Sequence, residues 1–335
     1  MIILAGDIGG TKSNLGLFER SPDGRPKPIV EETFPTHDYP SPAAMLAKFL
    51  EGKTKPHSLA GCCLGLAGPV DDGVVVAEWL PWPRITEQEV AEQSGIRGVW
   101  FINDMVATSY GVTVLEGEQL VTLNKGIVRS RPHNIAVIAA GTGLGESALI
   151  VDRQGRYHAV ASEGGHTNFA PRTELELGMF RWLKDRVHPV NQEALICGRG
   201  LVNIYTYLKW QRTNAASPAP ALPPDGSLAA TISKSAADGS DPIAAEALDV
   251  FMSAYGARAG SLAMQVTAVG GCYVGGGVAP KNLAKIQDGT FMKAFVDKGH
   301  VFEPICRNIP VYVVMEQKTA LLGAAQYGML EAKVV

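Results

Sequence analysis

The sequence predicts an α/β protein made of two similar halves, and three observations carry this prediction. Signals typical of strands and helices alternate along the first hundred residues. An apolar strand, a glycine turn and a second apolar strand occur at 4–18 and again at 134–152. The chain has 335 residues, 46% of them hydrophobic, which suits two domains of roughly 100–200 residues each. We therefore expect an internal duplication.

The first half begins with a strand hairpin and a third strand. A helix then starts at Ser41 and Pro42 and stops at Gly52, because these residue types favour the beginning and the end of a helix. The next apolar run, 59–68, is typical of a central strand covered on both faces. In order, we expect strands at 1–8, 14–20, 28–34, 59–68 and 99–104, and helices at 41–52 and 86–95.

Beyond residue 170 the pattern is mainly helical. Residues 214–226 are rich in Pro and Ala and predict an exposed, mobile loop rather than a domain linker, because helices of the same character resume after it. We expect helices at 173–187, 198–211, 241–268 and 319–332, a strand with a glycine turn into a helix at 270–280, and a strand at 309–315.

Composition argues against several classes of protein. The net charge of −3 gives no bulk attraction to nucleic acid or to a membrane surface. The N-terminal apolar run is short and lacks a basic flank, so we expect neither a signal peptide nor a membrane span. The cysteines are odd in number and form no C-x-x-C pair, which predicts reduced, mostly buried thiols in a cytoplasmic protein without a zinc site. They are Cys62, Cys63, Cys197, Cys272 and Cys306.

The first glycine turn resembles a phosphate cradle but contains an acid. The P-loop pattern does not fit, because Lys12 follows Thr11 and a strand rather than a helix comes next. Glycines still allow backbone N–H groups to face an oxyanion. Asp7 is then explained by a divalent cation between it and the phosphates, since Mg²⁺ is usually held by one or two carboxylates plus phosphate oxygens. The alternative is an ordinary hairpin with Asp7 as a turn residue.

Two clusters of polar residues are candidates for chemistry. Asn103 and Asp104 stand where a buried strand ends and a helix begins, the edge at which open α/β sheets bind ligands. Both residue types are also common helix caps, which is the alternative. Glu163 and His166 flank two glycines and suit the binding of adjacent hydroxyls, the alternative being a capped loop with an exposed histidine. Nothing local distinguishes Glu193 from a surface helix residue.

The second glycine turn, 141–145, raises the possibility of a dinucleotide-binding site. Three glycines occur there, with Glu163 about 20 residues further on. The third glycine is one position early, however, and a strand follows instead of a helix. This excludes the dinucleotide fingerprint and leaves a second hairpin of the phosphate-binding type, which offers Thr142 where the first has Asp7.

Seven motifs in order resemble the bacterial ATP-dependent glucokinases of the hexokinase superfamily. The resemblance covers nearly the whole chain, and the C-x-C-G-x-x-G-C motif of the related zinc-bearing repressor/kinase group is absent. The motifs are GDIGGTKSNLGL, FINDMVATSYG, AAGTGLGES, EGGHTNFAP, ICGRGLVNIY, CYVGGGVAP and ALLGAA.

The resemblance implies an α/β, two-domain actin-like (ribonuclease H-like) sugar kinase fold with a cleft between a small and a large domain. The small domain would hold residues 1–109 plus 317–335 and the large domain 110–316. The implied activity is phosphorylation of glucose to glucose 6-phosphate at the start of glycolysis, with ATP and Mg²⁺, in a homodimer. A kinase of another hexose, such as fructose or mannose, is the nearest alternative; a non-enzymatic actin-like ATPase module is a more distant one.

Site residues follow from the same resemblance. Asp104 would be the general base, and Asp7 would face Mg²⁺. Lys12 departs from some relatives, and we expect its side chain to face solvent. The implied glucose ligands are Asn103, Asp104, Glu163, His166 and Glu193, and the implied ATP-binding residues are Asp7, Gly9, Gly10, Thr11, Gly141, Thr142, Gly143, Gly145, Gly275, Gly276 and Gly277.

Overall fold

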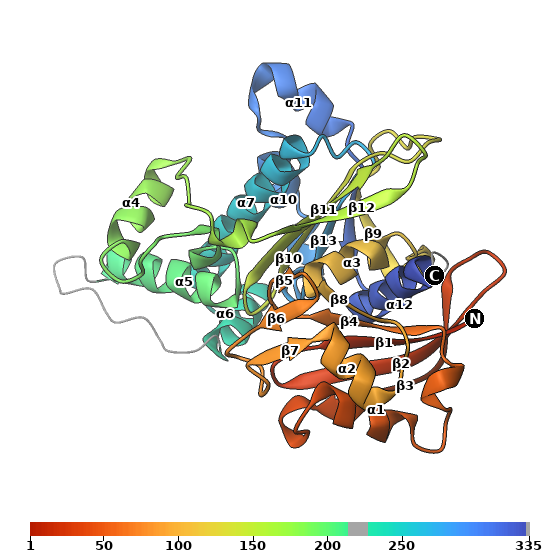
Figure 1. Cartoon of the computed structure of the whole chain (residues 1–335). Coiled ribbons are helices and arrows are strands. Elements are labelled where there is room, and N and C mark those ends of the chain that lie inside the picture. Colours follow the sequence, from red (N-terminus) through yellow and green to blue (C-terminus); the bar gives the residue numbers. More distant parts are fainter. Residues whose placement is uncertain (214–226, 333–335) are drawn as a thin grey trace. The chain divides into compact units, whose positions relative to one another are not determined.

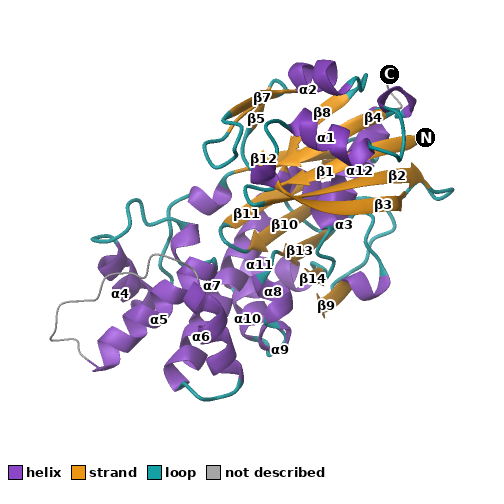
Figure 2. Ribbon diagram, turned by 90° about the horizontal axis from the view of Figure 1, so that it is seen from below, coloured by secondary structure: helices purple, strands orange, loops and turns teal. Residues whose placement is uncertain are grey.

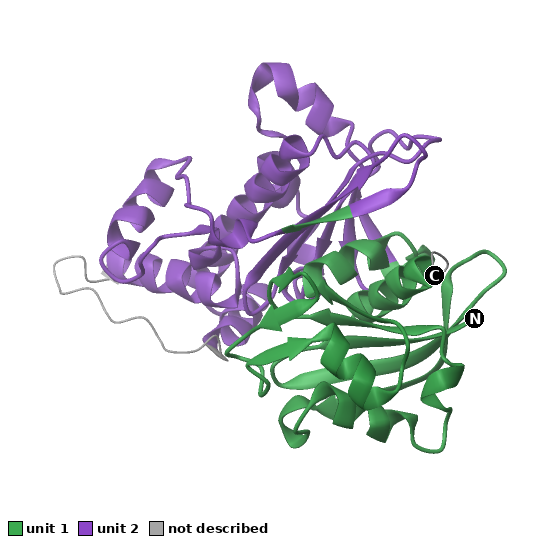
Figure 3. Cartoon of the chain, in the orientation of Figure 1, with its two compact units in different colours: residues 1–119, 159–161, 316–335 green, residues 120–158, 162–315 purple. Residues whose placement is uncertain are grey.

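The computed structural model of the chain describes residues 1–213 and 227–332, so the loop predicted at 214–226 lies outside the described residues. The chain forms two compact units (Figure 3). Unit 1 comprises Met1–Gln119, Ala159–Ala161 and Glu316–Val335, and unit 2 comprises Leu120–His158 and Ser162–Met315.

Unit 1 contains a five-stranded mixed sheet in the order β3-β2-β1-β4-β8. Strand β1 is antiparallel to β2 and parallel to β4, and β4 is parallel to β8. A separate small sheet, β5-β6-β7, was not predicted, because its strands are only two or three residues long. The strands are β1 (Ile2–Ile8), β2 (Lys12–Arg20), β3 (Pro26–Pro35), β4 (Gly61–Leu66), β5 (Val70–Asp71), β6 (Val74–Val76), β7 (Arg84–Thr86) and β8 (Val99–Asn103).

Helices cover both faces of the five-stranded sheet. They are α1 (Pro42–Leu50), α2 (Glu87–Ser94), α3 (Asp104–Val112) and α12 (Thr319–Glu331). Ile3 and Ala5 of β1 pack with α3 and α12, whereas Leu4 and Ile8, on the opposite face, pack with α1. This alternation follows from the period of two in a strand. Helices α3 and α12 lie side by side in Figure 1, although almost the whole of unit 2 separates them in the sequence.

Unit 2 contains a six-stranded sheet in the order β12-β11-β10-β13-β14-β9. Strand β10 is antiparallel to β11 and parallel to β13, and β13 is parallel to β14. A hairpin followed by two parallel strands is thus the plan of both large sheets, as the predicted duplication requires. The strands are β9 (Leu120–Asn124), β10 (Ile135–Ala140), β11 (Leu144–Val151), β12 (Tyr157–Ser162), β13 (Gly271–Gly275) and β14 (Val311–Val314).

Helix α7 lies at the centre of unit 2. It packs against β10 and β13 and runs beside α5 and α6 (Figure 2). Its buried residues lie on all sides, as in a helix surrounded by other elements. The helices are α4 (Glu174–Leu183), α5 (Gly198–Thr213), α6 (Ser227–Ala237), α7 (Pro242–Gln265), α8 (Val278–Lys281), α9 (Leu283–Ile286), α10 (Thr290–Val296) and α11 (Gly299–Arg307).

All five cysteines are buried free thiols, as predicted. Among the described residues, no helix has both the length and the hydrophobicity needed to span a bilayer.

Candidate functional site

The first glycine turn joins β1 to β2 and is fixed by a residue from beyond β3. The hydroxyl of Thr36 donates to the carbonyl oxygen of Gly9 at 2.7 Å, and Thr36 Oγ1 lies 2.9 Å from Ser13 Oγ. Both hydroxyl-bearing residues are fully buried. The backbone N–H of Gly9 donates to the carbonyl oxygen of Lys12 at 3.1 Å. These hydrogen bonds therefore fix the backbone of the turn. Within it, Gly10 is partly buried and Thr11 is exposed.

Asp7 is partly buried one residue before β1 ends. Asn14 Nδ2 donates to its Oδ2 at 3.2 Å, and Thr33 Oγ1 donates to Asn14 Oδ1 at 2.8 Å, so the three side chains form a row across β1, β2 and β3. Burial raises the pKa of Asp7, while the Asn14 hydrogen bond and the charge of Lys12 lower it. The Lys12 side chain is exposed, yet its charge acts on this carboxylate.

These contacts fit an Mg²⁺ ligand. A carboxylate that is partly buried and held through one oxygen by an amide leaves its other oxygen in place for a cation. Among the described residues, no three His, Cys, Asp or Glu side chains gather where they could hold a metal. A cation at Asp7 would thus take its other ligands from phosphates and water, the usual arrangement for Mg²⁺.

Asn103 and Asp104 occupy the junction between β8 and α3. Asn103 is the N-cap of α3: its Oδ1 accepts from the N–H groups of Met105 at 2.9 Å and Val106 at 3.3 Å. Its Nδ2 donates to the carbonyl oxygen of Gly68 at 3.0 Å. Asp104 is the first residue of α3, partly buried, and its Oδ1 accepts from the Met105 N–H at 2.8 Å.

The first turn and this junction lie at one edge of the unit 1 sheet. In the strand register, Ile8 pairs with Leu66 and Leu66 pairs with Asn103, which places β1 and β8 about 10 Å apart with β4 between them. Trp79 connects the first glycine turn with the β8–α3 junction. Its carbonyl oxygen lies 3.0 Å from where a Cβ of Gly10 would be, and its ring packs on Gly68, which accepts the Asn103 hydrogen bond. Unit 1 thus brings together the predicted metal ligand and the predicted base.

Within unit 2, the second glycine turn joins β10 to β11. The N–H of Gly141 donates to the carbonyl oxygen of Gly143 at 2.8 Å, and the carbonyl oxygen of Gly141 accepts from Gly198 at 2.9 Å. The 275–277 glycines follow β13, which neighbours β10. Gly276 has a φ of 76°, and a Cβ there would lie 2.3 Å from the carbonyl oxygen of Ala140. The two glycine segments therefore meet at one edge of the sheet.

Glu163 and His166 frame a single 3₁₀ turn, Gly164–His166. Their side chains are each 60% exposed, and the carboxylate of Glu163 makes no cap hydrogen bond to the turn. The turn packs against a second segment, because Gln192 N–H donates to Thr167 at 2.9 Å and Asn191 Nδ2 lies 3.3 Å from His166 Nδ1. The exposed carboxylate and imidazole thus stand on a backbone held by its neighbours.

Glu193, which no local signal in the sequence distinguishes from a surface helix residue, is held by contacts within unit 2. It lies in the 3₁₀ turn Gln192–Ala194 and is partly buried. Its Oε2 accepts from the N–H of Leu144 at 3.0 Å and lies 2.7 Å from where a Cβ of Gly143 would be. Unit 2 therefore places Glu193 beside both the second glycine turn and the segment that carries His166.

A further residue that organises the site gave no signal in the sequence. Tyr255 of α7 accepts a hydrogen bond from the N–H of Ala140 at 3.1 Å and reaches the carbonyl oxygen of Gly275 at 3.2 Å. Burial raises the pKa of its phenol well above the ordinary value. Tyr255 thus connects β10 and β13 where their glycine segments begin, yet a tyrosine within a helix does not stand out in a sequence.

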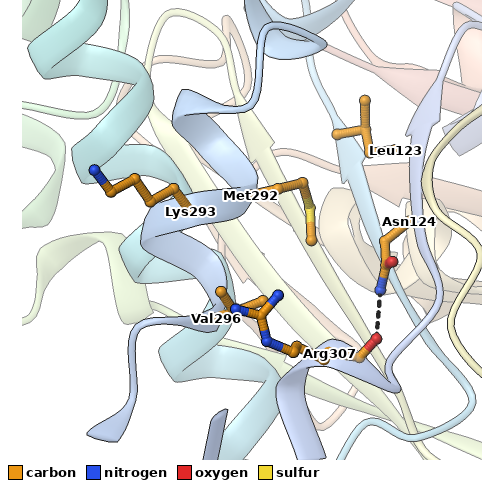
Figure 4. Close-up of a pocket in the computed structure, with 6 residues that line it drawn as sticks. All are labelled: Leu123, Asn124, Met292, Lys293, Val296 and Arg307. Atoms are coloured by element: carbon orange, nitrogen blue, oxygen red, sulfur yellow. Dashed lines mark hydrogen bonds between the residues drawn. The ribbon is translucent and has the colours of Figure 1, made fainter. Parts of the chain in front are cut away.

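Two hollows in unit 2 lie away from all of these residues. One, of about 430 Å³, is open between β9, α10 and α11 (Figure 4). The other, of about 310 Å³, lies beside Tyr157 and Tyr312. Neither is lined by a predicted site residue. The predicted site is therefore defined by strand ends and turns.

Comparison with known proteins gives consistent results. A model of the glucokinase family matches residues 4–331. The chain is 37% identical to a glucokinase of Nostoc sp. over 97% of this chain and 98% of that protein, and 31% identical to a glucokinase of Colwellia psychrerythraea over 98% and 96%. The crystal structure of a glucokinase from an Antarctic psychrotroph, 28% identical, superposes with a TM-score of 0.84 over 97% of this chain and 98% of that one.

Proposed function

Because this chain belongs to the glucokinase family, its activity is the ATP-dependent phosphorylation of glucose to glucose 6-phosphate, and we propose which of its residues carry that activity. The alternative of a non-enzymatic actin-like module is thereby set aside. The fold is the two-sheet actin-like kinase fold of the solved glucokinases.

Asp104 is the proposed general base. The supporting observation is that Asn103, not Asp104, is the N-cap of α3: Asn103 Oδ1 accepts from two N–H groups of the first turn, and the Asp104 carboxylate accepts from one of these, that of Met105. Asp104 would accept the proton of the sugar 6-hydroxyl as its oxygen attacks the γ-phosphorus and ADP leaves. A positioned base of this kind typically contributes about 10²–10⁴-fold in rate.

The other sugar hydroxyls need partners, because unpaired polar groups in a closed site are costly. Glu163, His166 and Glu193 are the proposed partners in unit 2, and Asn103 in unit 1. The Asn103 amide oxygen already accepts two N–H groups and one amide hydrogen goes to Gly68. Its contribution to the sugar would therefore be its second amide hydrogen.

The proposed ATP-binding residues are the two glycine turns and the 275–277 glycines. Their support is that each turn stands at the end of a central strand with its backbone fixed by hydrogen bonds. Backbone N–H groups so placed can stabilise the charge of the transferred phosphoryl group. Bound Mg²⁺ neutralises phosphate charge, and Asp7 is the residue proposed to hold it.

We also propose that the enzyme works in the cytoplasm as a homodimer. Five free, buried cysteines support a reducing compartment. Helix α11 has an exposed apolar face formed by Val301, Phe302 and Ile305. Exposed apolar patches of this kind often mark protein–protein interfaces. Light scattering of the wild type and of Phe302→Asp tests the proposal: a monomer mass for the wild type would contradict the dimer, and a dimer mass for Phe302→Asp would contradict this interface.

A coupled ADP-release assay over glucose, fructose and mannose tests the proposed specificity, with Asp104→Asn as the matched variant. We expect glucose to give the highest kcat/KM and the variant to lose turnover on every sugar. A higher kcat/KM for another hexose would contradict the choice of sugar.

A further inference from the structure

A buried ion pair lies under the segment proposed to bind glucose. Glu146 of β11 is 0% exposed and Arg258 of α7 is 11% exposed. Arg258 Nε donates to Glu146 Oε1 at 2.6 Å, and Arg258 Nη2 donates to Oε2, so the pair is bidentate. Burying two charges is costly, and such pairs often stabilise a fold no better than apolar side chains of the same size. A contribution to stability therefore does not by itself account for this pair.

The pair contacts the backbone of the Glu163–His166 segment. A Cβ at Gly164 would lie 2.0 Å from Oε2 of Glu146 and 3.0 Å from Nη2 of Arg258. The Gly164 α-carbon thus rests directly on the paired charges, and a Cβ there would force the pair or the segment to shift. At Gly165 a Cβ would lie 2.1 Å from the carbonyl oxygen of Leu144, two residues before Glu146 on the same strand.

The start of β11 consequently contacts every proposed sugar ligand of unit 2 or its immediate neighbour. Gly164 and Gly165 lie between Glu163 and His166, so the positions of these exposed side chains follow from where the two glycines rest. The N–H of Leu144 holds Glu193.

We propose that Glu146 and Arg258 are positioning residues for glucose binding, an inference that rests on the sugar-binding role proposed above for Glu163 and His166. The bidentate pair fixes the height and orientation of the Gly164–Gly165 backbone and, through it, the two side chains that meet the sugar hydroxyls. Neither residue of the pair contacts substrate.

The test separates positioning from stability with a double substitution. A single change leaves one charge buried without its partner and lowers the melting temperature. Glu146→Met with Arg258→Met removes both charges and leaves no buried polar side chain without a partner, so we expect a melting temperature near that of the wild type. We expect the glucose KM of this double variant to rise at least tenfold, with the ATP KM changed less than twofold. Arg258→Lys, which keeps the charge but not the bidentate geometry, should lie between wild type and double variant.

Two further variants keep the test decisive. Gly164→Ala forces the segment off the pair and should raise the glucose KM in the same way, whether or not the double variant folds. The exposed pair Arg212–Glu246 is the matched control: Arg212→Met with Glu246→Met should leave both KM values unchanged.

A folded double variant, or a folded Gly164→Ala, with a wild-type glucose KM would overturn the proposal. Glu163→Gln, measured alongside, distinguishes a failure of the positioning role of the pair from a failure of the proposed sugar site. If Glu163→Gln raises the glucose KM and the pair variants do not, only the positioning role fails. If Glu163→Gln has no effect, the proposed sugar site itself fails.

Discussion

The side chain of Asn103 caps helix α3, and Asp104, the next residue, begins the helix. Asn103 Oδ1 accepts from two N–H groups of the first turn, a task that either Asn or Asp performs about equally well at a helix start. Asn103 is therefore the cap of the helix, while the Asp104 carboxylate, whose Oδ1 also accepts from the Met105 N–H, is the group proposed to act as the base.

Replacing Asp104 by Asn should lower kcat by about 10²-fold or more, because the proton acceptor is lost while the shape is kept. The melting temperature should be unchanged and glucose affinity should stay within about tenfold, roughly 1.4 kcal/mol. Steady-state kinetics and calorimetry with glucose measure both. Asn103→Ala is the matched variant: loss of the cap should cost about 1 kcal/mol of unfolding free energy. Near-normal kcat in Asp104→Asn would defeat the general-base assignment.

Asp7→Ala should raise the KM for Mg-ATP and leave glucose binding largely intact, because Asp7 is assigned to the metal side of the site. Calorimetry with glucose alone checks this in a folded variant. Loss of glucose binding there would contradict the assignment.

Asn14→Ala should shift the acidic limb of kcat/KM for Mg-ATP to higher pH. Asp7 is active as the carboxylate, and the Asn14 hydrogen bond is one of the two influences that lower its pKa against the effect of burial. Without it the pKa rises further, so activity is lost at a higher pH as the solution is acidified. The same rise favours the protonated form in the folded state, so the unfolding free energy should decrease as pH rises just above 3.8, the ordinary value.

Lys12→Gln should shift the limb in the same direction by a smaller amount, since the Lys12 charge is the weaker influence. Thr33→Val, which removes only the far end of the row, is the control and should move the limb least. A limb at the same pH in wild type and Asn14→Ala would refute the role of the row. The measurement is kcat/KM for Mg-ATP between about pH 4 and 8 at saturating glucose. This range begins near the ordinary pKa of a carboxylate and extends above it, where a raised pKa would place the limb.

Glu193→Ala should raise the KM values of both glucose and ATP, whereas Glu163→Gln and His166→Ala should raise that of glucose alone. Glu193 holds the N–H of Leu144 next to the second glycine turn, so its loss disturbs the nucleotide side as well. The exposed His166 side chain lies instead near Asn191, at 3.3 Å, and near Glu163, at 3.9 Å. Steady-state kinetics with each substrate varied separates the patterns. An ATP KM unchanged in Glu193→Ala would show that the bond to Leu144 does not support the turn.

Tyr255→Phe should raise the ATP KM several-fold with little change in glucose affinity. The substitution leaves the buried N–H of Ala140 without its acceptor, which typically costs about 1–3 kcal/mol. Tyr205→Phe is the matched control, because it removes a hydroxyl that donates to Asp241, the N-cap of α7. Equal ATP KM values in the two variants would contradict a role for Tyr255 at the glycine segments.

The two glycine turns and most of the large strands and helices could be predicted from the sequence, whereas β9, β12, α6, α10 and α11 were not predicted. These features depend on local periodicity and on residues such as Ser41, whose side chain accepts from the Ala44 N–H at the helix start as expected. Asp104 was also found this way, because a polar residue after an apolar strand stands out in a sequence. The predicted domain limits, the cleft between the domains and the roles of the site residues stay predictions.

The surroundings of those residues, by contrast, depend on the packing of the folded chain. Glu193 pairs with Leu144 across 49 positions and Arg258 with Glu146 across 112. Local pattern cannot reveal such pairs, because each residue looks ordinary until the strand register and the packing of α7 bring the partners together. The short strands β5 to β7 were not predicted for a related reason. Two or three residues are too few to show a periodic pattern, and the pairing of these strands is a property of the folded chain.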